Sequence, residues 1–403
     1  MTTELSAATF KLTATAALSP AQQQLEHALL TFITTHLSQP TTGLFVIHGD
    51  AGTGKSAVLA AAFSRLQALS RSATPNALQG TDNYLVVNHN EMLKIYKRLA
   101  GSAPNLRKKD FQKPTPLINQ LTKTDRLADV VFIDEAHLLL TQPDRYNRFN
   151  GQNQLAELIN HSRVVVLVFD AHQVLKLKSY WQAADLQPFL AQYPHETFNL
   201  DEQFRVTGNA QVINWIDQFT QGHLLPQPVD ANFDFRIFAD GQPMYDLIRQ
   251  RDRQVHLARL IATADFPYVV NHGTWYVTAG HLKLPWDKVN LTDDPWALRP
   301  ETLNEVGSIY TIQGFDLNYA GVILGPSVGY DAATDRIIIH LNRYEDQEAF
   351  KNRSDLGELA ALKTQIVFNS INVLMKRGRY GLYITAVDPA LRQRLSELSA
   401  SQS

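Results

Sequence analysis

A glycine-rich segment constrains this chain more than any other part of its sequence. It fits the pattern G-x-x-x-x-G-K-[ST], in which glycines let backbone N–H groups turn toward phosphate oxygens. The segment lies after an apolar run and before a helix-like stretch, so the helix N-terminus would add its positive dipole end. We therefore predict a phosphate-binding loop made by eight residues: Gly49, Asp50, Ala51, Gly52, Thr53, Gly54, Lys55 and Ser56.

The last two residues of the loop have specific expected roles. Lys55 would contact the β- and γ-phosphates of a nucleotide, and the Ser56 hydroxyl would bind Mg²⁺. A plain glycine-rich turn between a strand and a helix is the alternative. It does not explain why both flanks agree with the full eight-residue pattern.

An acidic pair, Asp134 and Glu135, follows a second apolar run. In a P-loop fold a strand ends beside the phosphate loop with a carboxylate for Mg²⁺, and Asp134 meets that requirement. A carboxylate next to the metal site can act as general base toward water, so Glu135 indicates hydrolysis. A solvated acid pair at a strand end is the alternative. His137 either couples the site to a partner domain or is an ordinary residue at a strand end.

Apolar strand-like runs alternate with helical patterns through the first half of the chain, which favours a parallel sheet covered on both faces. The pattern changes near residue 200, so we predict two α/β domains, residues 1–199 and residues 200–403. Strands are expected at 84–88, 130–134, 164–170, 233–238, 272–278, 320–325 and 381–388. Helices are expected at 22–37, 57–68, 91–99, 153–160, from 243 onward, and at 356–376.

Composition narrows the class of protein. The chain has 403 residues, no cysteine and a formal net charge of −2. Disulfides, thiolate zinc sites and cysteine nucleophiles are therefore excluded. No apolar run approaches the roughly 20 residues that span a bilayer, and no secretory signal is visible at the N-terminus. We expect a cytoplasmic protein without a membrane partner, in which any binding of polyanions depends on local basic patches.

Further motifs follow in sequence order. The run VVVLVFDAHQVL begins with an expected strand that ends in Asp170, and Gln173 follows three residues on, where a glutamine can contact the γ-phosphate side. LDEQFR, TIQGFDLNYAGVILGP and RGRYGLYITAVDPAL come later. In this order the motifs resemble superfamily 1 helicases, and more closely the Schlafen group 3-like DNA/RNA helicase domain, from about residue 18 to 392. Residues 134–137 read DEAH, but true DEAH-box proteins carry a Ser-Ala-Thr element after this acidic motif, and no such element follows it here.

The resemblance implies a fold and several residue roles. The fold would be two RecA-like P-loop NTPase domains with parallel sheets and a nucleotide cleft between them. ATP would be the nucleotide, with Gln22 recognising adenine and Asp316 touching the ribose. Arg205 and Arg377 would act as arginine fingers. Lys376 departs from the threonine usual before that arginine, and a solvated helix end is the alternative interpretation of Arg377.

Single-stranded nucleic acid binds to cations along a groove and to flat rings that stack on bases. Lys108 and Lys109 lie in a basic run, and Trp181 follows the run VVVLVFDAHQVL, where related motors carry stacking aromatics. A solvated charged surface and a core tryptophan are the alternative interpretations.

Two functions are compatible with these motifs. The first is an ATPase that moves on or remodels single-stranded DNA or RNA, with a separate nuclease or other protein as a possible partner. The second is a nucleotide-controlled switch that binds a protein and does not translocate. A P-loop kinase is a poorer fit, because kinases rarely need a second RecA-like half or a glutamate in the position of Glu135. Stimulation of hydrolysis by nucleic acid would distinguish the first two.

Overall fold

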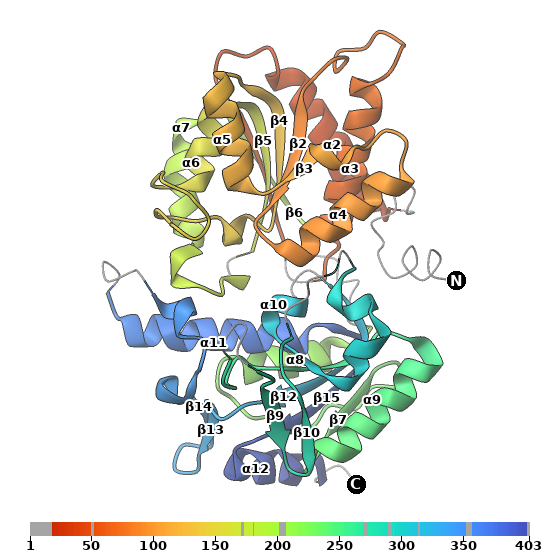
Figure 1. Ribbon diagram of the computed structural model, residues 1–403, viewed down its shortest axis with the longest axis vertical. Coiled ribbons are helices and arrows are strands. Elements are labelled where there is room, and N and C mark those ends of the chain that lie inside the picture. Colours follow the sequence, from red (N-terminus) through yellow and green to blue (C-terminus); the bar gives the residue numbers. More distant parts are fainter. Residues whose placement is uncertain are drawn as a thin grey trace. The chain divides into compact units, whose positions relative to one another are not determined.

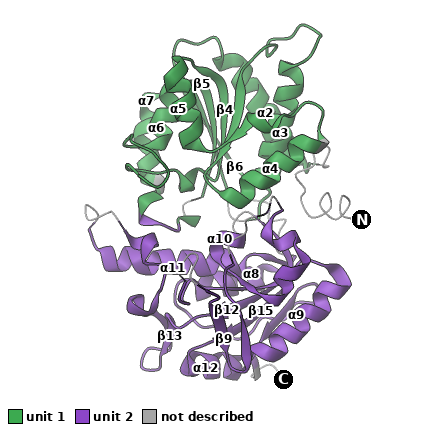
Figure 2. Ribbon diagram, in the orientation of Figure 1, with its two compact units in different colours: residues 1–174, 178–203 green, residues 175–177, 204–403 purple. Residues whose placement is uncertain are grey.

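The computed structural model describes residues 18–49, 52–170, 173–179, 181–200, 207–268, 273–288, 292, 294–312, 315–351 and 357–400 (Figure 1). The chain divides into two units. Unit 1 contains residues 1–174 and 178–203, and unit 2 contains residues 175–177 and 204–403 (Figure 2). Each unit is built around its own parallel sheet.

Unit 1 has, in its described residues, a six-stranded sheet with the order β3-β2-β4-β5-β1-β6. Every neighbouring pair in it is parallel. The strands are β1 (Gly43–His48), β2 (Asn83–Val87), β3 (Phe111–Gln112), β4 (Ala128–Asp134), β5 (Ser162–Phe169) and β6 (His195–Asn199). The central strands β1, β2, β4 and β5 are almost wholly buried, as expected for a parallel sheet that is covered on both faces.

Helices flank this sheet on two sides. The helices are α2 (Pro20–His36), α3 (Lys55–Ser70), α4 (Asn90–Ser102), α5 (Pro114–Thr124), α6 (Gln154–Asn160) and α7 (Gln187–Gln192). Figure 1 shows α2, α3 and α4 on one side of the strands and α5, α6 and α7 on the other. Leucines and isoleucines of α5 and α6 pack with β1, β2, β4 and β5 in one buried cluster.

The strand register places the ends of three strands together. His48 of β1 is level with Phe169 of β5, and Ile133 of β4 is level with Leu167 of β5. Because parallel strands end at the same edge of a sheet, the segments after β1, β4 and β5 meet there. These segments carry the phosphate loop, the acidic pair and Asp170.

Unit 2 repeats the parallel plan with the order β11-β8-β12-β15-β7 among its described residues. Its strands are β7 (Asp234–Ile237), β8 (Ala258–Ala262), β11 (Val306–Gly307), β12 (Leu317–Leu324) and β15 (Gly378–Ala386). Two antiparallel hairpins accompany them, β9 (Tyr276–Ala279) with β10 (Leu282–Pro285), and β13 (Val328–Asp331) with β14 (Arg336–Ile339). The helices are α8 (Ala210–Phe219), α9 (Gly241–Val255), α10 (Ile309–Ile312), α11 (Leu359–Met375) and α12 (Pro389–Ala400).

The α/β class with parallel sheets is as predicted, and the expected elements lie within a few residues of the observed ones. The sequence analysis did not predict β8, although this strand lies inside the sheet of unit 2. None of the helices in the described ranges has the length and apolar character that crossing a bilayer requires.

Candidate functional site

The phosphate loop connects β1 to α3, as its sequence pattern predicts. Gly52 has φ +95° and Gly54 has φ +80°, conformations that L side chains rarely adopt. α3 begins at Lys55, directly after Gly54. Asp50 and Ala51 lie outside the described residues.

Gly49 has no room for a side chain. A Cβ placed there would lie 2.6 Å from the carbonyl oxygen of Leu200 and 2.9 Å from Oγ1 of Thr53. Both distances are shorter than any real Cβ contact, so the start of the loop requires glycine. This close approach packs the loop against the segment that follows β6.

Lys55 lies inside the loop and is 7 % exposed. Its ammonium group donates to the carbonyl oxygen of Gly49 and lies 3.7 Å from Oδ2 of Asp170. Gln173 Nε2 donates to the same carboxylate oxygen at 2.6 Å. Lys55, from the start of α3, therefore meets Asp170 and Gln173, from the segment after β5, at the carboxyl edge of the sheet.

Asp134 is fully buried at the end of β4 and has several hydrogen-bond donors around it. Oδ1 accepts from the Ser56 hydroxyl at 3.1 Å and from the Glu135 backbone N–H at 3.0 Å, and Oδ2 accepts from the Tyr96 hydroxyl at 2.6 Å. Burial, and then the charge of Glu135, raise the pKa of Asp134 to about 6. A cation next to this carboxylate would favour its charged form.

Ser56 and Asp134 fit a magnesium ion in chemistry. A hydroxyl and a carboxylate are the hard oxygen ligands that Mg²⁺ takes, usually with waters and substrate phosphates completing the octahedron. Within the described ranges, no group of three or more His, Asp or Glu side chains could hold a metal ion by itself. The two residues would therefore share the ion with a nucleotide.

Glu135 has a backbone conformation that is uncommon outside glycine, with φ +53°. Such residues often mark functional sites, where the surrounding structure maintains the strain. Its Oε2 lies 2.9 Å from Nε2 of His137, which is fully buried in the short 3₁₀ helix η2 (Ala136–Leu138). The Glu135 carboxylate and the His137 ring are therefore in contact.

Sequence reasoning missed Tyr96 and the position of Asp170 beside Lys55. Tyr96 carries no motif, and its contact with Asp134 depends on how α4 packs. Asp170 did have a signal, because it directly follows a buried strand whose neighbours end in the phosphate loop and in Asp134.

Gln22 is buried in the first turn of α2, whereas Gln23 and Gln24 are exposed. Its amide oxygen accepts from the Ser19 backbone N–H at 3.0 Å, and the Ser19 side chain accepts from the Gln22 N–H at 3.4 Å. This reciprocal pair caps the helix. Adenine recognition by Gln22 stays a prediction.

In unit 2 the motifs around Asp316 and Arg377 lie side by side. Arg377 is 1 % exposed, and its Nη1 donates to the carbonyl oxygen of Phe315 at 3.3 Å. The Leu317 N–H donates to the Arg377 carbonyl oxygen at 3.0 Å, where β12 and β15 begin to pair. Arg377 is therefore not a solvated helix end. Arg205 lies outside the described residues.

Lys376, the departure from the family pattern, is bound within unit 2. Its ammonium group lies 2.7 Å from Oδ1 of Asp217 on α8. The side chain is 9 % exposed, so it ties the end of α11 to α8.

The nucleic-acid candidates divide into two groups. Trp181 is 3 % exposed, packs against Phe169 and Phe189, and donates its indole N–H to the Leu139 carbonyl oxygen at 2.9 Å. The expectation of a stacking platform at Trp181 is therefore corrected, because the ring belongs to the core of unit 1. Lys108 and Lys109 are exposed.

Comparison with known proteins places the chain in a family. Residues 42–388 match the family described as Schlafen group 3, DNA/RNA helicase domain. The chain belongs to this family. The uncharacterized protein YPL245W of Saccharomyces cerevisiae is 42% identical over 410 residues, covering 94% of this chain and 90% of that protein. The predicted family resemblance is thereby confirmed, and it supports a helicase-like function.

Solved structures give weaker matches. The Pif1 helicase from Candida albicans is 12% identical and covers 96% of this chain and 100% of that chain, with a TM-score of 0.39. A DNA replication initiation factor is 10% identical over 60% of this chain and 54% of that chain, with a TM-score of 0.26. Similarities at these scores carry no argument about fold or function.

Proposed function

We propose that the protein is an ATPase of superfamily 1 helicase type, which hydrolyses ATP to move on or remodel single-stranded DNA or RNA. Its two units would each be RecA-like. The observation that carries the proposal is the convergence of Lys55, Ser56, Asp134 and Glu135 at one edge of a parallel sheet.

The residues of unit 1 would divide the chemistry among them. Lys55 would turn from the Gly49 carbonyl to the β- and γ-phosphates. Ser56 and Asp134 would hold Mg²⁺, and this ion, when bound, neutralises charge on the phosphate oxygens. Glu135, in contact with His137, would accept a proton from the attacking water.

The remaining predicted residues would recognise the nucleotide or respond to its state. Gln173, already bonded to Asp170, would contact the γ-phosphate side. Gln22 would recognise adenine and Asp316 would touch the ribose. Arg205 and Arg377 would supply guanidinium groups that stabilise the charge of the transition state, which are worth about 10³–10⁵ in rate in other NTPases.

The direct test of hydrolysis is the steady-state ATPase rate of Lys55→Ala. We expect turnover to fall below detection, because the phosphates lose their only cation from the loop. Lys123→Ala is the matched control, since it removes an exposed lysine of α5 in the same unit. Equal ATPase rates in the two variants would contradict the proposal.

A further inference from the structure

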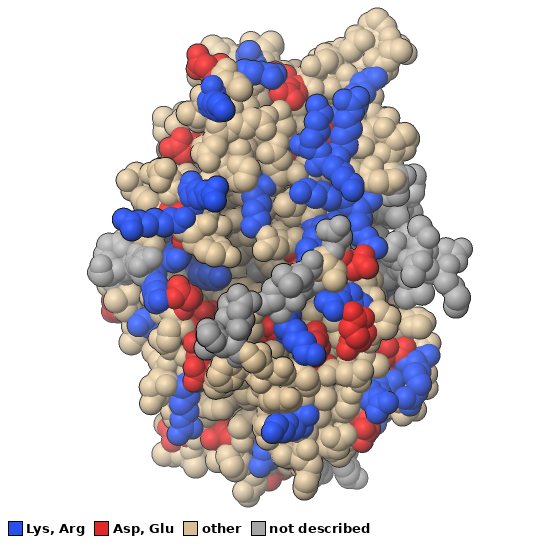
Figure 3. All heavy atoms as spheres, viewed as in Figure 1, with Lys and Arg blue, Asp and Glu red and all other residues tan. Residues whose placement is uncertain are grey.

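The segment from α4 to the residue after β3 is strongly basic in a chain that is slightly acidic overall. Residues 90–113 contain seven cationic and two acidic side chains, whereas the whole chain has 37 and 39. Five of the cations are exposed: Lys97, Arg98, Arg107, Lys108 and Lys109. Figure 3 shows Lys and Arg side chains gathered on the visible face of unit 1, over the part that α4 crosses in Figure 1. We call these five cations the α4–η1 surface.

Both acidic side chains of the segment are buried and do not lie on this surface. Asp110 is 3 % exposed and pairs with Arg71, which caps the end of α3. Glu91 is 6 % exposed and lies 2.8 Å from Lys94. Among the described residues, no carboxylate forms an ion pair with Lys97, Lys108 or Lys109. Their positive charge therefore faces solvent uncompensated.

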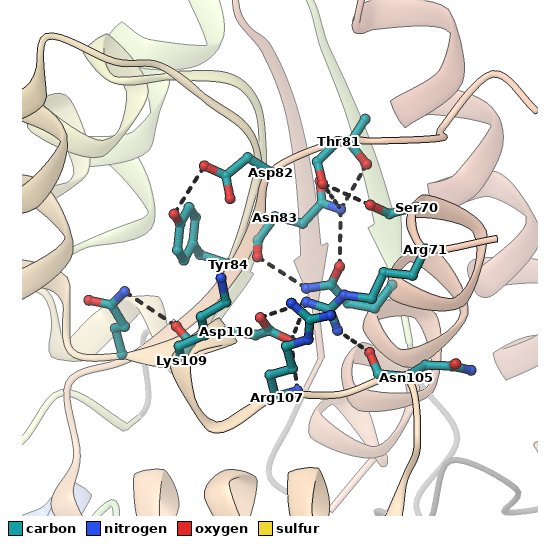
Figure 4. Close-up of polar contacts among 12 residues, drawn as sticks. Ser70, Arg71, Thr81, Asp82, Asn83, Tyr84, Asn105, Arg107, Lys109 and Asp110 are labelled. Carbon is teal, nitrogen blue, oxygen red and sulfur yellow. Dashed lines mark hydrogen bonds and ion pairs between the residues drawn. The ribbon is translucent and has the colours of Figure 1, made fainter. Parts of the chain in front are cut away.

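Asp110 also fixes the shape of the turn that carries Arg107, Lys108 and Lys109, which is the 3₁₀ helix η1 (Lys108–Asp110) and the residue before it. Arg71 Nη2 donates to both carboxylate oxygens, at 2.8 and 2.9 Å, and the Arg107 backbone N–H donates to Oδ2 at 2.8 Å (Figure 4). Arg71 Nη1 donates to the carbonyl oxygen of Asn105. The turn is thus held by partly buried, charge-assisted hydrogen bonds.

The two parts of the surface are packed together. The rings of Tyr96 on α4 and Phe111 on β3 are stacked at 5.6 Å with an interplanar angle of 7°. Burial, and then the nearby charge of Lys97, lower the pKa of Lys113. Lys97 and Lys113 therefore lie close enough for their charges to repel each other.

The side chains indicate which part of a ligand would be recognised. Lysines are point charges that attract phosphates without reading bases. The aromatic rings of this segment, Tyr96 and Phe111, are buried and offer no face for stacking. A row of fixed cations without aromatic partners suits the sugar–phosphate backbone of a nucleic acid.

We propose that the α4–η1 surface binds the phosphodiester backbone of DNA or RNA without base recognition, and that Asp110 positions its cations. The choice of nucleic acid over another polyanion rests on the proposed function. Arg71, which pairs with Asp110 at this surface, follows the C-terminal end of α3, and the phosphate loop lies at the N-terminal end of the same 16-residue helix. The length of α3 therefore separates this turn from the phosphate loop. At 1.5 Å per residue this is about 24 Å.

The first test measures binding of fluorescent 30-nucleotide single-stranded RNA, single-stranded DNA and duplex DNA to the full chain, without ATP, over a range of salt concentrations. We expect Lys108→Ala/Lys109→Ala to weaken binding of every sequence equally. The slope of log K against log[salt] should fall by about 1.4 for single strands, at about 0.7 per lost phosphate contact. Lys123→Ala/Arg126→Ala, a pair of exposed cations elsewhere in unit 1, should bind like the wild type.

The polymer that shows the largest loss identifies the natural backbone. Equal affinities and slopes for the two double variants would overturn the proposal. So would competition by polyglutamate as strong as by an oligonucleotide of equal charge, because the surface would then suit acidic proteins.

A second test separates positioning from simple charge. Asp110→Asn makes the segment more positive, so a surface that acts only through its net charge would bind more tightly. A surface that needs its shape would bind several-fold more weakly, and Asp110→Glu should recover part of the loss. Tighter binding by a folded Asp110→Asn variant would overturn the positioning role.

The binding results can be interpreted independently of the ATPase proposal. Binding is measured without nucleotide, and the Lys108→Ala/Lys109→Ala variant keeps every residue assigned to ATP. If Lys55→Ala retains turnover but the double variant loses binding, the proposed ATP site fails and the α4–η1 surface stands. The reverse pattern of results would retain the ATP site and remove this surface.

Discussion

The two parallel sheets have the same plan but different carboxyl edges. In unit 1 the edge carries a glycine turn, Lys55 and Asp134, next to the N-terminus of α3. In unit 2 the corresponding edge is filled by its own side chains. Asp265, after β8, accepts from the Thr263 hydroxyl at 2.7 Å and from the Ser327 N–H at 3.3 Å.

The same parallel plan therefore carries different turns and side chains at the carboxyl edges of the two units. A Cβ on Gly325, directly after β12, would lie 2.4 Å from Oδ2 of Asp265, so the carboxylate packs directly against the backbone there. Unit 2 instead presents its motif residues, Asp316 and Arg377, where β12 and β15 begin. The residues that differ between the two units therefore lie at the strand ends and in the loops, and not within the sheets themselves.

The largest expected effect tests whether unit 2 contributes to hydrolysis at all. Arg377→Ala should lower the ATPase kcat by about 10³–10⁵, as loss of an arginine finger does. Arg379→Ala is the matched control, because this half-buried guanidinium lies over the ring of Tyr380, 5.1 Å from its centre. Similar ATPase rates for the two variants would remove Arg377 from the active site.

Because Arg377 is buried, its loss could also unfold unit 2. The Tm and ATP binding of Arg377→Ala should therefore be measured together with its turnover. A role in the transition state lowers kcat while ATP binding stays within a few-fold of the wild type.

The next effect tests the general base in unit 1. Glu135→Gln keeps the shape of the side chain but cannot accept a proton, so the ATPase rate should fall about 10²–10⁴-fold. ATP binding should persist, because Lys55 and Ser56 are unchanged. A normal hydrolysis rate in this variant would show that another group activates the water.

A third prediction concerns Asp265, at the carboxyl edge of the sheet in unit 2. Burial raises the pKa of Asp265 to about 6, so the folded state holds its proton at a pH where the unfolded chain has lost it. Stability from this group is present below about pH 4 and is lost as the pH rises to about 6. Asp265→Asn should therefore gain up to about 3 kcal/mol relative to the wild type between pH 4 and pH 8.

Urea unfolding of both proteins at several pH values would measure this difference. Asp331→Asn is the control, since Asp331 is half-buried at the end of β13 and its hydrogen bonds with Thr334 and Ala333 lower its pKa. A difference between wild type and Asp265→Asn that does not change with pH would contradict a charged, buried Asp265.

The smallest effect concerns Tyr96, whose hydroxyl contacts the proposed metal ligand Asp134. Groups that hold a metal ligand in place contribute about tenfold or more to metal affinity. Tyr96→Phe should therefore raise the Mg²⁺ concentration for half-maximal ATPase activity by about tenfold. Tyr84→Phe removes a hydroxyl hydrogen bond to Asp82, which has no proposed role at the metal. It should leave the Mg²⁺ dependence unchanged. Identical Mg²⁺ dependence in both variants would make Tyr96 a packing residue only.

The phosphate loop and Asp134 could be predicted from the sequence because their signals are local. Glycines at fixed spacing and an acid after an apolar run each determine a strand end by themselves. The predicted parallel sheets followed from the same alternation of apolar runs and helical patterns.

Contacts between distant segments could not be predicted. The Tyr96–Asp134 bond joins residues 38 apart and depends on the rotation of α4. Trp181 was misassigned because its burial depends on Phe169 and Phe189, which no local pattern connects to it. Strand β8 was missed because Arg259 interrupts its apolar run, and only the fold supplies the partners that let this arginine be buried, Asp252 and Thr302.

The most direct measurement is the steady-state ATPase rate of the full chain at low salt, with and without single-stranded RNA or DNA, beside Glu135→Gln. Stimulation of the wild type by at least one polymer, together with loss of activity in Glu135→Gln, is the predicted result. Hydrolysis that neither polymer changes would contradict a nucleic-acid motor and would indicate a nucleotide-controlled switch for a protein partner.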